Sequence, residues 1–150
     1  MKCEEVMKRD PCRLAPDDPA AFAAMQMESA NVGFLPVCDA AGIVIGTVTD
    51  RDLATRVLAT RIDPETPVRQ IMTRDVITCR PADDLRAAER RMAIGRVSRV
   101  VCTDETGHLV GVISLSDIAL HDSDRRVAQT LREVADREVS ASTVTIGPSS

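Results

Sequence analysis

Gly46-Thr47-Val48-Thr49-Asp50-Arg51-Asp52 is the stretch that decides the fold, because it returns 65 residues later as Gly111-Val112-Ile113-Ser114-Leu115-Ser116-Asp117. Both copies place a hydroxyl residue three positions after a Gly and an Asp three positions after the hydroxyl. Residues 6–54 align with 71–119 without a gap, and thirteen of the aligned positions are identical. Two copies are too few for a solenoid, which needs at least ~3 stacked units. We therefore expect two half-units packed about a pseudo-twofold axis, with any cleft between them lined by both.

The composition excludes several classes of protein. A chain of 150 residues with 44% apolar and 28% charged residues suits one soluble globular domain. Phe22 and Phe34 are its only aromatic residues and its net charge is −4, so it lacks the stacking platforms and the basic footprint of a nucleic-acid binder. No apolar run approaches the ~18 residues of a membrane helix, and charged residues interrupt the N-terminus where a signal peptide would be apolar. We expect a cytoplasmic protein that contacts neither nucleic acid nor membrane.

The five cysteines form an odd set without a Cys-x-x-Cys spacing. A disulfide framework or a zinc site would need paired, closer spacings. We expect reduced thiols that serve mostly as small apolar residues, and no metal site.

The order of elements is the same in each repeat: a helical turn, a strand, a helix, two strands and a final helix. The longer helices are expected to start at Asp18-Pro19 and Asp83 and to end near Asn31 and Gly95, each with an apolar stripe. The strand pairs are Phe34–Cys38 with Ile43–Thr49, and Arg99–Thr103 with Leu109–Ser114, with Gly42 and Gly107 in their turns. A brief strand is expected around Cys12–Leu14 and another around Ile77–Cys79. The fold class is α/β (α+β), with two β-α-β-β-α repeats at 1–65 and 66–122, a C-terminal helix at 123–138 and a mobile tail at 139–150.

The repeated motif has two interpretations. Thr49-x-x-Asp52 and Ser114-x-x-Asp117 match a capping box, in which a hydroxyl caps a helix and an acid reaches back to the amide of the capping residue. The same residues suit a nucleotide: the hydroxyl can contact a phosphate or ribose, the carboxylate can accept from both ribose hydroxyls, and the Gly permits close backbone approach. Physical chemistry alone favours neither interpretation, and the two are compatible.

The paired motifs resemble a tandem pair of cystathionine-β-synthase (CBS) domains, also called a Bateman module. The resemblance covers roughly 1–135. It also rests on four shorter stretches: Val6-Met7-x-x-Asp10, Leu35-Pro36-Val37-x-Asp39, Thr49-Asp50-Arg51-Asp52 and Ile71-Met72-Thr73-Arg74-Asp75. Such modules bind adenosine nucleotides in two clefts between the repeats: the Asp holds the ribose, the hydroxyl and nearby basic residues hold phosphate, and apolar strand residues sandwich the adenine.

The resemblance implies two sets of site residues, each drawn from both repeats. One cleft would combine Thr49, Arg51 and Asp52 with Ile77, Val97, Ser98 and Arg99. The other would combine Ser114, Ser116 and Asp117 with Cys12, Val32 and Gly33. We expect Arg51 and Arg99 to make the Asp52 cleft the better phosphate site, because Ser116 and Phe34 occupy the corresponding positions of the Asp117 cleft.

The function implied is regulation without catalysis. Neither His108 nor His121 has a partner that suggests a nucleophile and base, and no Walker loop or HExxH motif occurs. The resemblance implies an energy sensor that binds AMP, ADP or ATP, with S-adenosylmethionine or NADH possible, and acts on an unknown partner protein. It also implies a flat homodimer, for which Ala54, Val57, Leu58, Ile118 and Ala119 are candidate contacts. The alternatives are a ligand-free scaffold and, with less support, a cysteine-based redox sensor.

Overall fold

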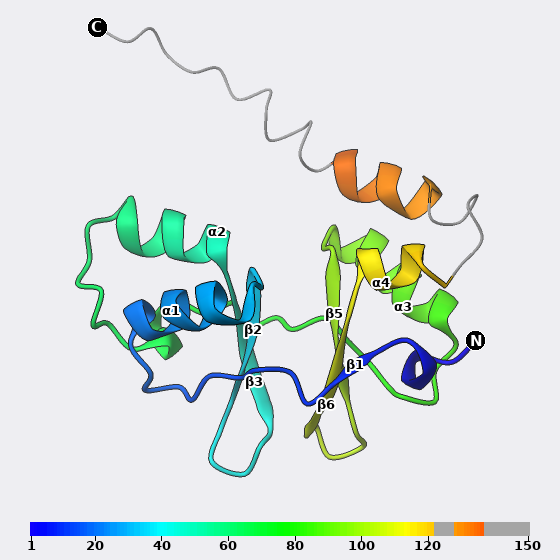
Figure 1. Cartoon of the computed structure of the whole chain (residues 1–150), viewed down its shortest axis with the longest axis horizontal. Coiled ribbons are helices and arrows are strands. Elements are labelled where there is room, and N and C mark those ends of the chain that lie inside the picture. The colour runs from blue at the N-terminus through cyan, green and yellow to red at the C-terminus, as the bar shows by residue number, and fades with distance from the viewer. Residues whose placement is uncertain (122–127, 137–150) are drawn as a thin grey trace, which may run out of the picture.

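The computed structural model describes residues 1–121 and 128–136, which form two similar halves side by side (Figure 1). The first repeat holds η1 (Cys3–Glu5), β1 (Lys8–Arg9), α1 (Ala20–Ala30), β2 (Phe34–Cys38), β3 (Val44–Thr49), α2 (Asp50–Asp52) and the π-helix η2 (Leu53–Leu58). The second holds η3 (Val68–Gln70), β4 (Thr78–Cys79), α3 (Leu85–Gly95), β5 (Arg99–Thr103), β6 (Leu109–Ser114) and α4 (Leu115–Ala119). Residues 128–136 are also helical. The predicted fold class, two mixed α and β repeats, is confirmed.

Two antiparallel hairpins form the centre of the molecule. β2 pairs with β3, and β5 pairs with β6, each with a register shift near the turn. Gly42 and Gly107 have φ of 85° and 88°, so they take the positive φ predicted for them. The two turns also hold each other, because the Val44 amide donates to the Gly107 carbonyl at 3.0 Å and the Leu109 amide donates to the Gly42 carbonyl at 3.2 Å. These bonds fix the two hairpins side by side at one end.

The start of each repeat crosses to the opposite half. β1 pairs with β6, so the four-stranded sheet has the order β1-β6-β5-β4 (Figure 1). Cys3, Val6 and Met7 are buried with the core of α3, β5 and β6. In the reciprocal arrangement, Val68, Ile71 and Met72 are buried with the core of α1, β2 and β3. Each half is therefore completed by a segment of the other repeat.

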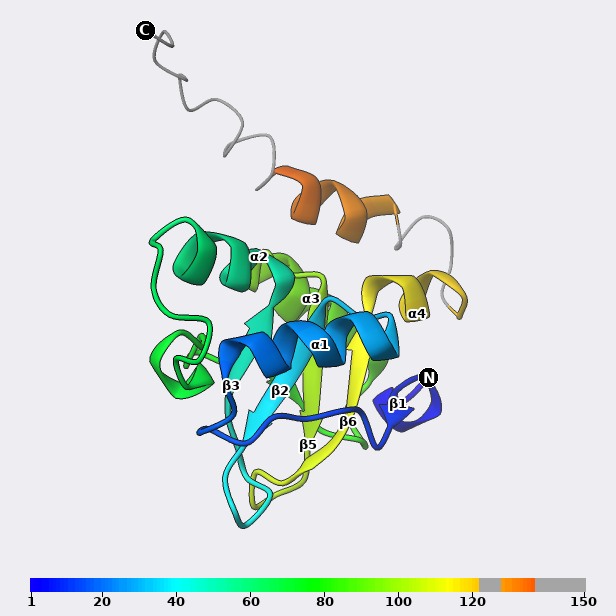
Figure 2. The same cartoon turned by 60° about the vertical axis from the view of Figure 1, so that its left-hand side comes forward.

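Small aliphatic side chains fill both cores. Ala20, Ala23 and Met27 of α1 pack onto β2 and β3, and α1 lies across this hairpin in Figure 2. Leu85, Ala88 and Met92 do the same for α3 on β5 and β6. The stripes predicted from the sequence are the buried faces of these helices. A third cluster, Cys38, Val101 and Leu109 with Phe34 packed against it, lies where the two hairpins meet.

The helix starts differ from the prediction by one or two residues. The N-cap of α1 is Pro19, without a side-chain cap, and that of α3 is Asp84, which accepts from the Arg86 amide. Asp18 and Asp83 instead accept from the backbone amides of Ala15 and Arg80 in the preceding turns. Acidic residues favour turns and N-caps through the same short-range bond, so the sequence could not separate the two roles.

Three further expectations meet the structure with mixed outcomes. The strand expected at Cys12–Leu14 is reduced to a single parallel bridge from Leu14 to Val37. Val57 and Ile118 are wrong as dimer contacts, because both are buried in the core of the chain itself, whereas Leu58 is 78% exposed.

The rest of the expected C-terminal helix, and the tail at 139–150, lie outside the described residues. Among those described, no helix is long and apolar enough to cross a membrane.

We predict that Asp104 in the β5–β6 turn stabilises the fold in a pH-dependent way. Its Oδ1 accepts from the Thr106 hydroxyl and from the amides of Thr106 and His108, and these bonds, the hydroxyl first, lower the pKa of Asp104 from 3.8 to about 2. A lowered folded-state pKa gives stability that is complete above pH 3.8 and is lost as the pH falls to about 2. Asp104→Asn should therefore lower the unfolding midpoint at pH 7, and the gap to wild type should close between about pH 4 and about pH 2.

Thermal unfolding followed by circular dichroism at several pH values measures this gap. Glu105→Gln, an exposed change in the same turn, is the matched control and should show no such pH dependence. A gap that stays constant down to pH 2 would contradict the prediction.

Candidate functional site: a cavity between the repeats

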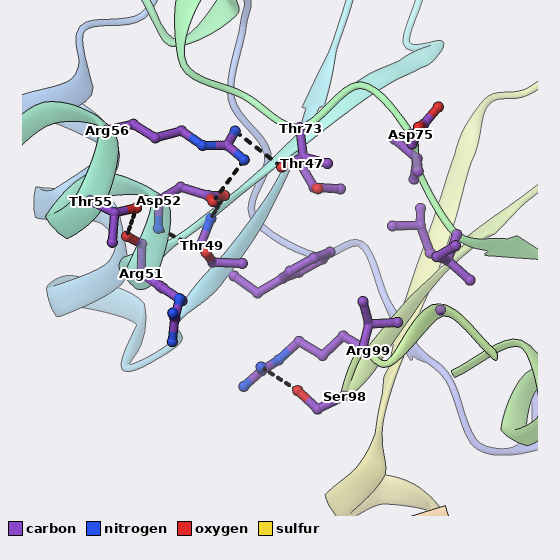
Figure 3. A pocket seen from close by; sticks show the side chains of 16 residues that line it. Thr47, Thr49, Arg51, Asp52, Thr55, Arg56, Thr73, Asp75, Ser98 and Arg99 are labelled. Carbon is purple, nitrogen blue, oxygen red and sulfur yellow. Dashed lines mark hydrogen bonds and ion pairs between the residues drawn. The ribbon is translucent and has the colours of Figure 1, made fainter. Parts of the chain in front are cut away.

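A cavity of about 500 Å³ opens between the two halves, with residues of both repeats in its lining (Figure 3). Its volume falls within the range of about 300–1,000 Å³ typical of small-molecule sites. The structure brings all seven residues of the first predicted set into this lining: Thr49, Arg51, Asp52, Ile77, Val97, Ser98 and Arg99. Their assignment to a ligand remains a prediction.

Thr49 and Asp52 form a reciprocal capping box at the end of β3. The Asp52 amide donates to Thr49 Oγ1 at 3.1 Å, and the Thr49 amide donates to Asp52 Oδ2 at 2.9 Å. The capping interpretation of the motif is therefore correct. It leaves the second interpretation open, because a carboxylate has two acceptor oxygens and only Oδ2 is used by the cap. Asp52 Oδ1 lies 3.7 Å from the Arg56 guanidinium, at the edge of the cavity.

One side of the cavity carries positive charge from both repeats. Arg51 follows β3 and Arg99 begins β5, and Figure 3 shows their guanidinium groups on the same side of the cavity. Arg99 lies 5.9 Å from the centre of the Phe34 ring and near Ser98, whose hydroxyl is 3.4 Å from the guanidinium. Neither arginine forms an ion pair with any residue in the described part of the chain. Two guanidinium groups without a carboxylate partner are well suited to an anion such as phosphate.

Much of the remaining lining of the cavity is apolar. It consists of Ile77, Val76, Val97, Val101 and Gly95, together with Phe34, whose ring lies beside Arg99. A Cβ on Gly95 would lie 3.1 Å from the Ile77 side chain, so the helix end and this wall pack closely. A flat, uncharged ring would find an apolar surface here and a charged group would find the arginines, so the cavity suits an amphiphilic ligand.

The sequence analysis missed several lining residues. Thr47, Thr55, Arg56, Thr73 and Asp75 contribute polar groups. Phe34 lines this cavity, although the repeat alignment placed it in the other cleft. Arg56 could have been found, because it lies four residues after Asp52 and such residues share a helix face. Thr73 reaches the cavity only because its segment pairs with β3, through the Thr73 amide to the Thr47 carbonyl and the Thr47 amide to the Thr73 carbonyl, both 2.9 Å.

Of the second predicted set, the structure brings together Ser114 and Asp117, in the other copy of the motif. Ser114 and Asp117 repeat the capping box, with bonds of 3.1 Å and 2.8 Å, and Asp117 is buried. Asp117 Oδ1 lies 3.5 Å from Lys8 Nζ, so its second oxygen faces a cation. Gly33 accepts from the Asp50 amide, and a Cβ there would come within 2.7 Å of the Asp50 carboxylate. Ser116, Cys12 and Val32 are exposed.

The described residues contain no group of three or more His, Cys, Asp or Glu side chains that could hold a metal. Four of the cysteines are buried and Cys12 is exposed. Cys79 Sγ lies 3.1 Å from Cys102 Sγ, and this contact with burial raises the pKa of Cys79 to about 12. Such thiols are poorly reactive because the thiolate is the nucleophile.

Comparisons with known proteins agree with this architecture. The chain is 30% identical over 125 residues to the CBS domain-containing protein YhcV of Bacillus subtilis, a match that covers 83% of this chain and 88% of that one. The CBS domain protein PAE2072 of Pyrobaculum aerophilum, solved in complex with AMP, superposes with a TM-score of 0.75 at 24% identity, over 88% of this chain and 99% of that one. The CBS domain pair of protein MJ0100, solved with 5-methylthioadenosine and S-adenosyl-L-methionine, gives 0.74 at 24% identity over 80% and 94%.

The family model of the CBS domain matches residues 3–59 and, a second time, residues 68–124. Together these two stretches cover most of the chain. The chain therefore belongs to the CBS domain family and carries two CBS domains in tandem.

Proposed function

We propose that this protein is a non-catalytic regulatory module that binds an adenosine compound in the cavity beside Asp52. One observation carries the proposal: a single cavity joins the Asp52 oxygen that the cap does not use, two arginines without a carboxylate partner and apolar side chains. These three features come from different repeats, so the site exists only when the two repeats pack together.

Each feature suits one part of the ligand. Asp52 Oδ1 can accept hydrogen bonds from the ribose hydroxyls while Oδ2 remains on the Thr49 amide. Ile77, Val97 and Val101 offer the adenine an apolar surface. Arg51 and Arg99 can each hold phosphate oxygens in a bidentate manner. AMP, ADP and ATP fit this distribution best, since a phosphate group uses both arginines. S-adenosylmethionine or NADH would use the same ribose and adenine contacts.

The two clefts are proposed to be unequal. Arg51 and Arg99 give the Asp52 cavity a positive side, whereas Ser116 takes the place of Arg51 beside Asp117. We therefore expect phosphorylated ligands to fill the Asp52 cavity first.

The broader assignments follow from the family. We propose an unidentified regulated partner, a homodimeric assembly and a cytoplasmic location. We also propose that the two repeats span residues 1–65 and 66–122.

A ligand-free scaffold is the second candidate function. It is favoured only by the capping boxes, which give both motif aspartates a structural role. A redox role is disfavoured by the raised pKa of the buried Cys79 thiol.

We predict that Asp52→Asn weakens binding while it keeps the hydrogen bonds of the cap. The amide carbonyl of Asn can still accept from Thr49, but its NH2 group would face the ribose hydroxyls where an acceptor is needed. Loss of a charged hydrogen-bond partner is worth roughly 1.5–3 kcal/mol, or about 10–150-fold in affinity. Calorimetry with AMP and ATP measures the loss, and Asp52→Ala should in addition lower the unfolding midpoint. Normal binding by Asp52→Asn would favour the scaffold.

We predict that Arg51→Ala and Arg99→Ala weaken ATP more than AMP, and leave adenosine nearly unchanged. Their guanidinium groups act on phosphate, and exposed charge pairs weaken with salt, so ATP affinity of the wild type should also fall most as salt is added. Calorimetry with the three ligands at two salt concentrations tests this. Equal losses for adenosine and ATP would contradict a phosphate role for these residues.

We predict that the helices after the two motifs carry the homodimer contact. Leu58 is 78% exposed and Leu120 is 80% exposed, and Figure 1 shows α2 and α4 on the same side of the hairpins. Large exposed apolar side chains are typical of an interface. Light scattering should give a dimer mass for the wild type and a monomer mass for the double variant Leu58→Glu, Leu120→Glu. Ala40→Glu, in the exposed β2–β3 turn at the other end, should remain dimeric.

A further inference from the structure

Arg56 connects three parts of the molecule that meet at the cavity. Its Nη2 lies 3.7 Å from Asp52 Oδ1. Its Nη1 donates to the Ile71 carbonyl at 2.8 Å and to Thr73 Oγ1 at 3.2 Å. Figure 3 shows this fork between Asp52 and Thr73, with the side chain reaching over from η2.

The hydrogen bonds of Asp52 explain why the first contact matters. Oδ2 accepts from the Thr49 amide, so Oδ1 is the oxygen left for a ligand. The Asp52 side chain is only 13% exposed, so little water competes for that oxygen. A cation 3.7 Å away holds the carboxylate in place, yet the distance exceeds that of a hydrogen bond. The lone pairs of Oδ1 therefore remain available to hydroxyl donors.

The other two contacts fix Arg56 itself. Ile71 and Thr73 belong to the leading segment of the second repeat, and Thr73 is paired with Thr47 of β3 by two backbone bonds of 2.9 Å. The helix also departs from α geometry here, because Leu53–Leu58 is a π-helix in which the Ala59 amide bonds to the Ala54 carbonyl. π-Helical turns are frequent at functional sites.

The second motif supplies an independent comparison. Asp117 Oδ1 also faces a cation, Lys8, at 3.5 Å. Lys8 corresponds by repeat to Thr73, whereas the counterpart of Arg56 is His121. The same carboxylate oxygen is thus neutralised in both motifs by residues at non-equivalent positions. Repeat symmetry does not explain why a cation lies beside Oδ1 in both motifs. A need for a cation beside the motif carboxylate does explain it.

We propose that Arg56 is a positioning residue of the Asp52 cavity, which orients the ribose-facing oxygen of Asp52 and links it to the leading segment of the second repeat. The proposal rests on the proposed function, because it takes the ligand to be an adenosine compound. Arg56 lies apart from Arg51 and Arg99, which Figure 3 places on another side of the cavity. It therefore acts on the sugar end of the ligand, and its effect is independent of the number of phosphates.

The test compares Arg56→Ala and Arg56→Lys with Arg80→Ala, which removes an exposed arginine outside the cavity lining. Calorimetry is done with adenosine, AMP and ATP on each full-length variant. Arg56→Ala should weaken all three ligands by the same factor, roughly two- to fivefold, the range of a partly exposed ion pair. Arg56→Lys should recover part of the loss, since it keeps the charge without the fork. In the Asp52→Asn background, Arg56→Ala should have no further effect on binding.

The outcomes separate the two proposals. Wild type that binds none of the three ligands overturns the proposed function and this inference with it. Wild type that binds while Arg56→Ala behaves like Arg80→Ala overturns the inference alone. A loss that is larger for ATP than for adenosine also overturns it, because Arg56 would then contact phosphate directly. If Arg56→Ala changes only the unfolding midpoint and leaves all affinities unchanged, the role of Arg56 is purely structural. That outcome also overturns the inference.

Discussion

The exchange of leading segments between the halves is the constraint on which the rest of the structure depends. Each repeat has one short hairpin and one 11-residue helix, with few large side chains to bury. Cys3, Val6 and Met7 complete one core, and Val68, Ile71 and Met72 complete the other. A half-unit without its partner's segment would expose these apolar faces to water, which is unfavourable in proportion to the area. The two repeats are therefore expected to fold as one unit.

The same exchange creates the cavity. Because the segment after Ile71 pairs with β3, Thr73 and Asp75 reach the motif of the first repeat, and Ile77 follows them into the wall. On the other side, β1 pairs with β6 and brings Lys8 to Asp117. The segments that cross between the halves therefore place different residues beside the two motifs. Thr73 lies at the first motif and Lys8 at the second. The asymmetry of the clefts has its origin in this crossing as much as in the motifs.

The motif shows how a side chain with a structural role could also have the binding role that we propose. Asp is shorter than the Glu or Gln usual in a capping box, yet in both copies it reaches the backbone amide of its hydroxyl partner. A carboxylate that uses one oxygen for the cap presents the other in a fixed direction. A fixed acceptor loses little entropy when it binds a hydroxyl donor, so structural and binding roles reinforce each other.

The sequence by itself determined the local features. Residue spacing gave both hairpins, nearly to the residue, with positive φ at Gly42 and Gly107, and it gave the buried faces of both long helices. These features depend on neighbours in the chain. The family resemblance identified seven of the residues that line the Asp52 cavity, because motifs at a fixed repeat offset occupy equivalent places. Only the tertiary structure decided which segment completes which half, which oxygen of Asp52 remains free, and that Arg56, Thr73 and Phe34 belong to the cavity. It also decided that Val57 and Ile118 are core residues. Such facts depend on contacts between residues far apart in sequence, for which local spacing carries no signal.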